Sequence, residues 1–137
     1  MKKWALPCFS INWIVSGGGW FESVATGKMA VKSGDAVLRF PYEPVRYGPE
    51  EGGEWSDFWM LFEGAQIEKL HKRTWIQPEH PVIQYPVTSK SLALWRQWIH
   101  WGSQRPPLLD RMAVQFQSWW LEGILAQSKH FSSREPV

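Results

Sequence analysis

The central part of the chain restricts the fold most strongly, because turn signals and short apolar runs alternate there. Ser33-Gly34-Asp35 predicts a tight turn, and the apolar run Ala36–Phe40 leaves that turn as a strand. Pro41 and Pro44 then interrupt any hydrogen-bonded ladder. After an acidic, glycine-rich loop, Trp55–Phe62 has the composition of a second strand. This order predicts antiparallel β-structure built from short strands.

The same alternation of turn signals and short apolar runs extends over residues 10–63. Apolar runs are separated by turn signals at regular intervals, which is typical of a β-sandwich or barrel. We expect Gly17-Gly18-Gly19 to separate the first two strands and Ala25-Thr26-Gly27 to turn the second into the third. The predicted strands are Ser10–Ser16, Trp20–Ser23, Lys28–Lys32, Ala36–Phe40, Val45–Tyr47 and Trp55–Phe62.

The second half of the chain predicts helices. Residues 64–88 contain several prolines and are expected to be irregular, with a short helix or turn at their start. Two antiparallel helices are expected at about 89–101 and 107–128, followed by a linker-like tail at 132–137. The predicted fold class is therefore mainly β with α, as one domain over residues 1–131.

Composition excludes several classes of protein. The chain has 137 residues, a length that suits one domain, and a net charge of +2 that forms no basic stripe for DNA. Its apolar runs are far shorter than the roughly 20 residues that span a membrane. Cys8 is the single cysteine, so no internal disulfide can form and a reducing, cytoplasmic setting is expected.

The last predicted helix has two apolar arcs. At about 100° per residue, a second and narrower arc carries Val114, Leu121 and Leu125. These could be scattered surface residues, or they could form a homodimer interface while the broad arc packs on the barrel. The broad arc consists of Leu109, Met112, Ala113, Phe116, Trp119, Trp120 and Gly123.

A series of motifs in fixed order carries a resemblance to a known family. The series is Gly17-x-Gly19, Gly34-Asp35, Pro41-x-x-Pro44, Tyr47, and Trp55-x-x-x-Trp59-x-x-Phe62. With two helices following, it resembles the sugar-sensing and dimerisation domain of AraC-type transcription regulators, a branch of the cupin superfamily. The resemblance implies a cupin-like β-barrel or jelly roll, a sugar-like effector, and a homodimer through the last helix. It also implies that DNA is contacted by a helix-turn-helix region absent from this chain, and not by this domain.

The chain departs from the family pattern at two places. Val45 and Arg46 stand where the family has histidines. The four histidines, His71, His80, His100 and His130, lie outside the predicted barrel strands, so no metal or other cofactor is expected. Ser16 replaces the family's arginine before the first glycine pair, so the ligand need not be arabinose.

The candidate ligand-binding residues are polar or aromatic side chains of the predicted barrel. Strand alternation places Asp57 and Trp59 on one face. Asp57 would accept hydrogen bonds from a polyhydroxyl ligand, or would instead be satisfied by water or an arginine. The resemblance implies that Trp59 stacks on a sugar and that Tyr47 points into the barrel; an ordinary core tryptophan is the alternative for Trp59. Arg39 and Ser16 are the remaining candidate ligand-binding residues.

Two classes of function follow from this pattern, and a structural dimer whose barrel is filled by side chains and binds nothing is a third possibility. The first is an effector-binding and dimerisation domain without enzymatic activity. The alternative is a small cupin enzyme, an isomerase, epimerase or lyase acting on a sugar or acid, with Asp57 and Tyr47 as its acid–base pair.

Overall fold

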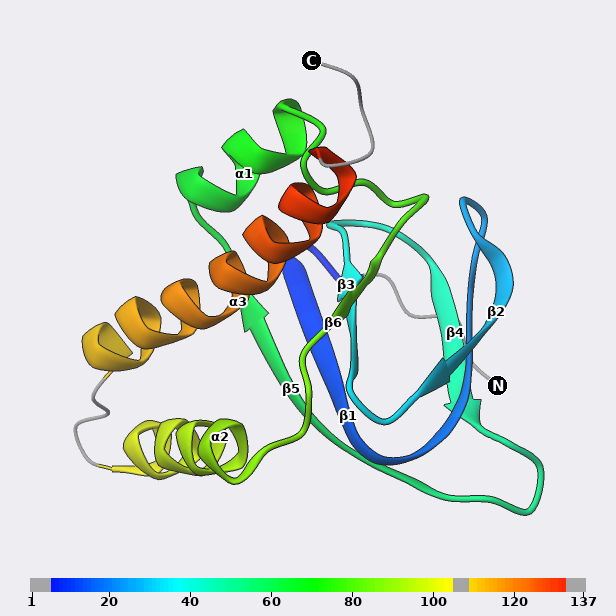
Figure 1. The fold of residues 1–137 in the computed structure, drawn as a ribbon, viewed down its shortest axis with the longest axis horizontal. Helices are drawn as coiled ribbons and strands as arrows, with labels where there is room; N and C mark the ends of the chain where they lie inside the picture. Colours follow the sequence, from blue (N-terminus) through cyan, green and yellow to red (C-terminus); the bar gives the residue numbers. More distant parts are fainter. Residues whose placement is uncertain (1–5, 105–108, 133–137) are drawn as a thin grey trace. The chain divides into compact units, whose positions relative to one another are not determined.

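A computed structural model describes residues 6–104 and 109–132. The chain forms two compact units, Met1–Tyr85 and Pro86–Val137. The first unit contains the strands and a short helix, and the second contains two helices (Figure 1). This confirms the predicted class, mainly antiparallel β-structure followed by helices.

The described part of the first unit contains six strands and one helix. All the strand pairs are antiparallel. In chain order the elements are β1 (Phe9–Ser23), β2 (Gly27–Lys32), β3 (Asp35–Arg39), β4 (Val45–Pro49), β5 (Trp55–Phe62), α1 (Ala65–Lys72) and β6 (Val82–Gln84).

Strand β1 organises the unit because it belongs to two sheets. Its first half pairs with β3 and β5, and its second half, from Gly18 onward, pairs with β2 and β4. The strand bends where it changes sheets, and Figure 1 shows it curling around the unit. A strand that passes between sheets in this way needs a bulge or bend, and the register with β5 shifts between Ile14 and Ser16. The result is a curled half-barrel.

The expectation that the glycine triplet separates two strands is wrong. The triplet lies inside β1, at the change of sheet. Gly17 has φ +76°, and a Cβ on it would meet the carbonyl oxygen of Glu54. A Cβ on Gly19 would meet the carbonyl oxygen of Gly48. Glycine is therefore required here by close backbone packing within a bent strand. The prediction was wrong because glycines are also typical of turns.

The region predicted as irregular is more ordered than expected. Helix α1 forms at its start, where a short helix or turn was predicted, and Ile67 and Leu70 are its buried residues. Strand β6 was not predicted, because three prolines stand close to it. It is only three residues long and pairs with β3, where Ala36 lies opposite Ile83.

The sheet formed by β5, β1, β3 and β6 has an apolar face. Phe9, Ile11 and Trp13 lie on it at alternate positions of β1, and all three are buried. Trp13 stacks on Phe58 and donates through Nε1 to the carbonyl oxygen of Tyr85 over 2.9 Å. The polar residues between them, such as Ser10 and Asn12, consequently face the other side of the sheet, which we call the inner face.

The second unit is a pair of antiparallel helices, α2 (Ser89–Ser103) and α3 (Leu109–Ser132). Thr88 caps α2 by accepting from the backbone N–H of Ser91, as its sequence position predicts. Both helices extend beyond their predicted ends at residues 101 and 128, and the predicted start at 107 lies outside the described residues, as does most of the predicted tail.

Aromatic side chains hold these two helices together. Trp95 and Trp98 of α2 contact Phe116 and Trp119 of α3 at ring-centroid distances of 5.4–6.1 Å. The Nε1 of Trp98 donates to Oε1 of Gln115 over 3.1 Å. Arg111, near the start of α3, lies over the ring of Trp101, near the end of α2, which confirms the antiparallel arrangement.

Candidate ligand-binding site

A hollow lies on the inner face, between the two sheets that share β1. It encloses about 240 Å³ of unfilled space, part of it open to solvent, and its enclosed part has room for about one water molecule. Most of its walls are apolar, with a few polar side chains among them, as is usual for small-molecule sites. The lining residues are Asn12, Ile14, Phe21, Val37, Arg39, Tyr47 and Trp55.

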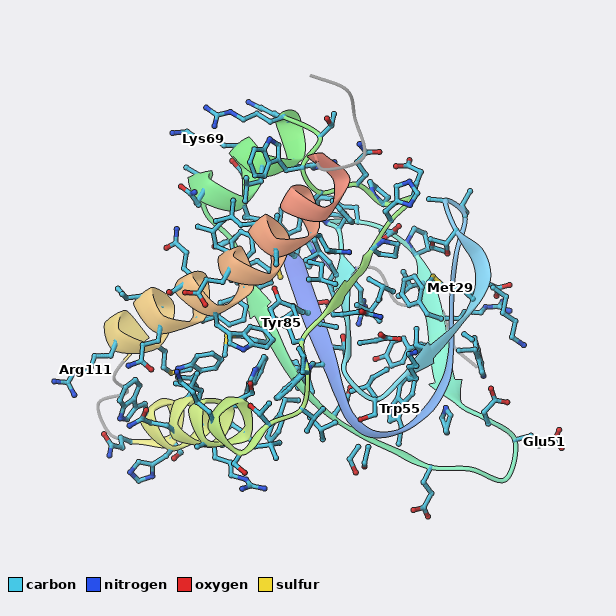
Figure 2. The ribbon with its side chains drawn as sticks, viewed as in Figure 1. Met29, Glu51, Trp55, Lys69, Tyr85 and Arg111 are labelled. Atoms are coloured by element: carbon cyan, nitrogen blue, oxygen red, sulfur yellow. The ribbon has the colours of Figure 1, made fainter. Side chains whose placement is uncertain are left out.

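Two of the predicted site residues, Arg39 and Tyr47, meet at this hollow. The guanidinium carbon of Arg39 lies 5.4 Å from the ring centroid of Tyr47, a cation–π contact. Tyr47 also stacks on Trp55, with ring centroids 5.9 Å apart and an interplanar angle of 14°. Figure 2 shows Trp55 at the beginning of β5. Arg46, which precedes Tyr47 in sequence, is exposed, because successive residues of a strand face opposite sides.

Asp57 has a protein partner that the sequence did not suggest. Asn12 donates from Nδ2 to Oδ2 of Asp57 over 2.9 Å. Water or an arginine had been considered as the hydrogen-bond partner of Asp57, but Asn12 fills that role for Oδ2. No hydrogen bond joins Asp57 to Tyr47, the acid–base pair of the enzyme alternative, among the described residues.

Trp59 lies on the same face but projects into solvent. In the ladder it is opposite Asn12, and Asp57 is opposite Ile14, so all four side chains share the inner face. Trp59 is 64% exposed, which excludes the ordinary core tryptophan. None of the residues of β5 is fully buried, and among the described strands β5 pairs only with β1.

Ser16 is not brought to the hollow. It lies opposite Ser56 beyond the bulge in β1 and is exposed. Asn12 and Ser10 are inner-face residues that the sequence reasoning missed. The available signal was their polar character at alternate positions between the buried Phe9, Ile11 and Trp13.

Several buried polar atoms of the inner face lack hydrogen-bond partners. They are Oγ of Ser10, Oδ1 of Asn12 and Nε of Arg39. Ser10 and Arg39 are directly opposite each other on β1 and β3. Buried polar groups are normally paired, so these three atoms mark a place where a ligand would complete the hydrogen bonding.

Among the described residues, no three His, Cys, Asp or Glu side chains lie close enough together to hold a metal ion. Glu43, beside the inner face, accepts a hydrogen bond from the backbone N–H of Phe40. Burial raises the pKa of Glu43, and it outweighs the lowering effects of that hydrogen bond and of Arg39.

The three residues predicted for a dimer interface remain accessible on α3. Val114 is 70% exposed and Leu125 is 39% exposed, while Leu121 is half-buried. Phe116 of the broad arc is buried.

In the part of the chain that the structure describes, no helix is both long enough and apolar enough to cross a membrane.

The curled β unit, its hollow and the following helix pair define a small-molecule-binding domain of the cupin-like class. A profile of the AraC-like ligand binding domain matches residues 5–135. The chain therefore belongs to the family of AraC-like ligand-binding domains, which serve effector binding in AraC-type transcription regulators. A comparison with curated proteins found no match.

Proposed function

We propose that this chain is the effector-sensing and dimerisation domain of an AraC-type transcription regulator, and that its effector is a sugar-sized polar molecule bound on the inner face. The observation that carries this proposal is the exposed indole of Trp59, on the same face as Asn12 and Asp57. A flat apolar ring beside hydrogen-bonding groups suits the C–H and O–H groups of a sugar.

The size of the hollow determines where such a ligand would lie. Its enclosed part is too small for a sugar, so the ligand would sit over the mouth of the hollow and contact Trp59 from one side. Asp57 retains Oδ1 for a ligand hydroxyl, since Asn12 occupies Oδ2. The ligand would contact Tyr47 and Arg39, which line the hollow, through its mouth.

The other parts of the proposal concern the partners of this domain. Val114, Leu121 and Leu125 would form the homodimer interface, because an exposed apolar stripe on a helix is a common partner surface. DNA would be contacted by a helix-turn-helix region of the regulator, and not by this domain, whose small net charge offers no basic stripe. A cytoplasmic location, without enzymatic activity, completes the proposal.

Titration of the purified protein with a panel of sugars, followed by tryptophan fluorescence and calorimetry, tests the ligand. A sugar that binds should change the emission, and Trp59→Ala should weaken its binding roughly tenfold and reduce that change. Trp75→Ala is the matched control, since Trp75 is also exposed but follows α1, outside the strands. If Trp59→Ala binds as the wild type does, Trp59 is not the stacking platform. If neither sugars nor sugar acids bind, the ligand class is wrong.

A further inference from the structure

Arg39 is a buried cation that forms no ion pair with any residue the structure describes. The side chain is only 7% exposed, and its Nε has no hydrogen-bond partner. Its guanidinium rests on the ring of Tyr47, which attracts the charge but accepts no strong hydrogen bond from it. A buried charge is costly unless it is paired, so the fold holds this group ready for an anion that the described residues do not supply.

Glu43 does not fill this role. It experiences the positive charge of Arg39, but burial is the larger effect and its pKa is raised overall. Its hydrogen bond goes to the backbone N–H of Phe40 and not to Arg39. Asp57, a carboxylate of the inner face, is engaged by Asn12.

A second unsatisfied donor lies beside Arg39. Ser10 is directly opposite Arg39 in the ladder between β1 and β3, is 1% exposed, and has no partner for its hydroxyl. The guanidinium can donate several N–H groups, and the serine hydroxyl can donate one more. Two donors of this kind on neighbouring strands fit the two oxygens of a carboxylate.

The next row of the same face accepts hydrogen bonds. Asn12 follows Ser10 on this face, and its Oδ1 is buried without a partner. Asp57 lies one row further and is itself an acceptor. Trp59, opposite Asn12, adds an apolar surface. The face therefore runs from donors at Arg39 to acceptors at Asp57.

From this polarity we infer that the effector is a hydroxylated carboxylic acid of sugar size, such as a uronic or aldonic acid. The inference rests on the proposed function and narrows its ligand class. The carboxylate would bind Arg39 and Ser10, and the hydroxyl groups would donate to Asn12 and Asp57. A neutral sugar would leave the charge of Arg39 buried and unpaired.

Calorimetric titrations with matched pairs of ligands test the inference. The acids are D-glucuronate, D-galacturonate and D-gluconate, and the neutral counterparts are D-glucose, D-galactose and D-glucitol. We expect at least one acid to bind at least tenfold more tightly than its neutral counterpart. Arg39→Gln should weaken the binding of that acid about 10- to 100-fold, as expected for loss of a charged hydrogen bond. Its effect on any neutral sugar should be small.

Three variants make the result specific to this pair of donors. Arg39→Lys keeps the charge without the planar fork and should bind the acid with intermediate affinity. Ser10→Ala makes a small change at a buried site and should weaken the binding of the acid by a smaller factor than Arg39→Gln does. This variant keeps the test informative if Arg39→Gln does not fold. Arg46→Gln is the control, because Arg46 is exposed on the strand that carries Tyr47.

The outcomes separate this inference from the function on which it rests. Binding of neutral sugars alone, or of acids with an affinity unchanged in both Arg39→Gln and Ser10→Ala, overturns the inference and leaves the proposed function standing. Binding of none of the six compounds contradicts both.

Discussion

Asn12 donates from Nδ2 to a carboxylate oxygen of Asp57 over 2.9 Å, joining β1 to β5 across the inner face. Replacing the amide by a second carboxylate, in Asn12→Asp, places two acceptors with like charges in contact. We expect the variant to lose about 1–3 kcal/mol of unfolding free energy at pH 7, measured by urea unfolding.

The reciprocal exchange is the control for this pair. Asn12→Asp combined with Asp57→Asn restores one amide and one carboxylate, so it should recover most of the lost stability. A single Asn12→Asp variant as stable as the wild type would show that the contact is not formed in solution.

Substitution by alanine should have opposite effects at two glycines, Gly19 in the bend of β1 and Gly102 in α2. In Gly19→Ala the new methyl group would meet the carbonyl oxygen of Gly48, and the two strands would have to separate. A loss of about 1–3 kcal/mol in unfolding free energy is expected, as for other overpacked sites. Gly102 lies in α2, where the nearest atoms to an added methyl are 3.6 Å away in the flexible side chain of Met112. Gly102→Ala should therefore stabilise by about 0.5–1 kcal/mol. Equal shifts of the melting temperature in both variants would contradict this account.

Glu43 predicts a dependence of stability on pH. Burial raises its pKa in the folded protein above the ordinary value of 4.5. The folded state therefore retains the proton to higher pH than the unfolded chain does. The stability from this group is complete below pH 4.5 and is lost as pH rises through the folded pKa.

Glu43→Gln removes this titration but keeps an oxygen that can accept from the N–H of Phe40. Its unfolding free energy relative to the wild type should increase as the pH is raised from about 4 to 7. Glu51→Gln, in the exposed loop before β5, is the control and should show no such trend. Parallel curves for wild type and Glu43→Gln in urea unfolding at each pH would exclude Glu43 as the source.

The fold class could be predicted from sequence because its signals are local. The turn at Gly34, the strands on either side of the prolines and the cap at Thr88 each depend on a few neighbouring residues. Errors arose where distant backbone decides the structure. Glycines of the β1 bend are required by Gly48 and Glu54, which are far along the chain, so no local pattern distinguishes them from a turn.

The candidate site could be predicted only in part for the same reason. Tyr47 was predicted from the family resemblance, and Arg39 as a polar side chain on the strand before it. Asn12 and Ser10 are significant because of what lies opposite them, Trp59 and Arg39, and that depends on the ladder register. A bulge after Ile14 changes the register, which moves Ser16 away from the hollow although its motif position suggested a ligand contact.

The exposed stripe of α3 predicts a dimer that a single charge should disrupt. Leu121 lies between Val114 and Leu125 on this stripe, so Leu121→Glu would bring two like charges together near the two-fold axis of an antiparallel helix pair. Because the stripe is narrow, we expect a modest interface and a dimer that depends on concentration. Sedimentation equilibrium over a concentration series should show a wild-type dimer and a folded Leu121→Glu monomer. Ala126→Glu adds the same charge at an exposed position about 140° around the helix from Leu121 and should remain dimeric. A wild type that stays monomeric at the highest concentration, or equal dissociation in both variants, would place the interface elsewhere.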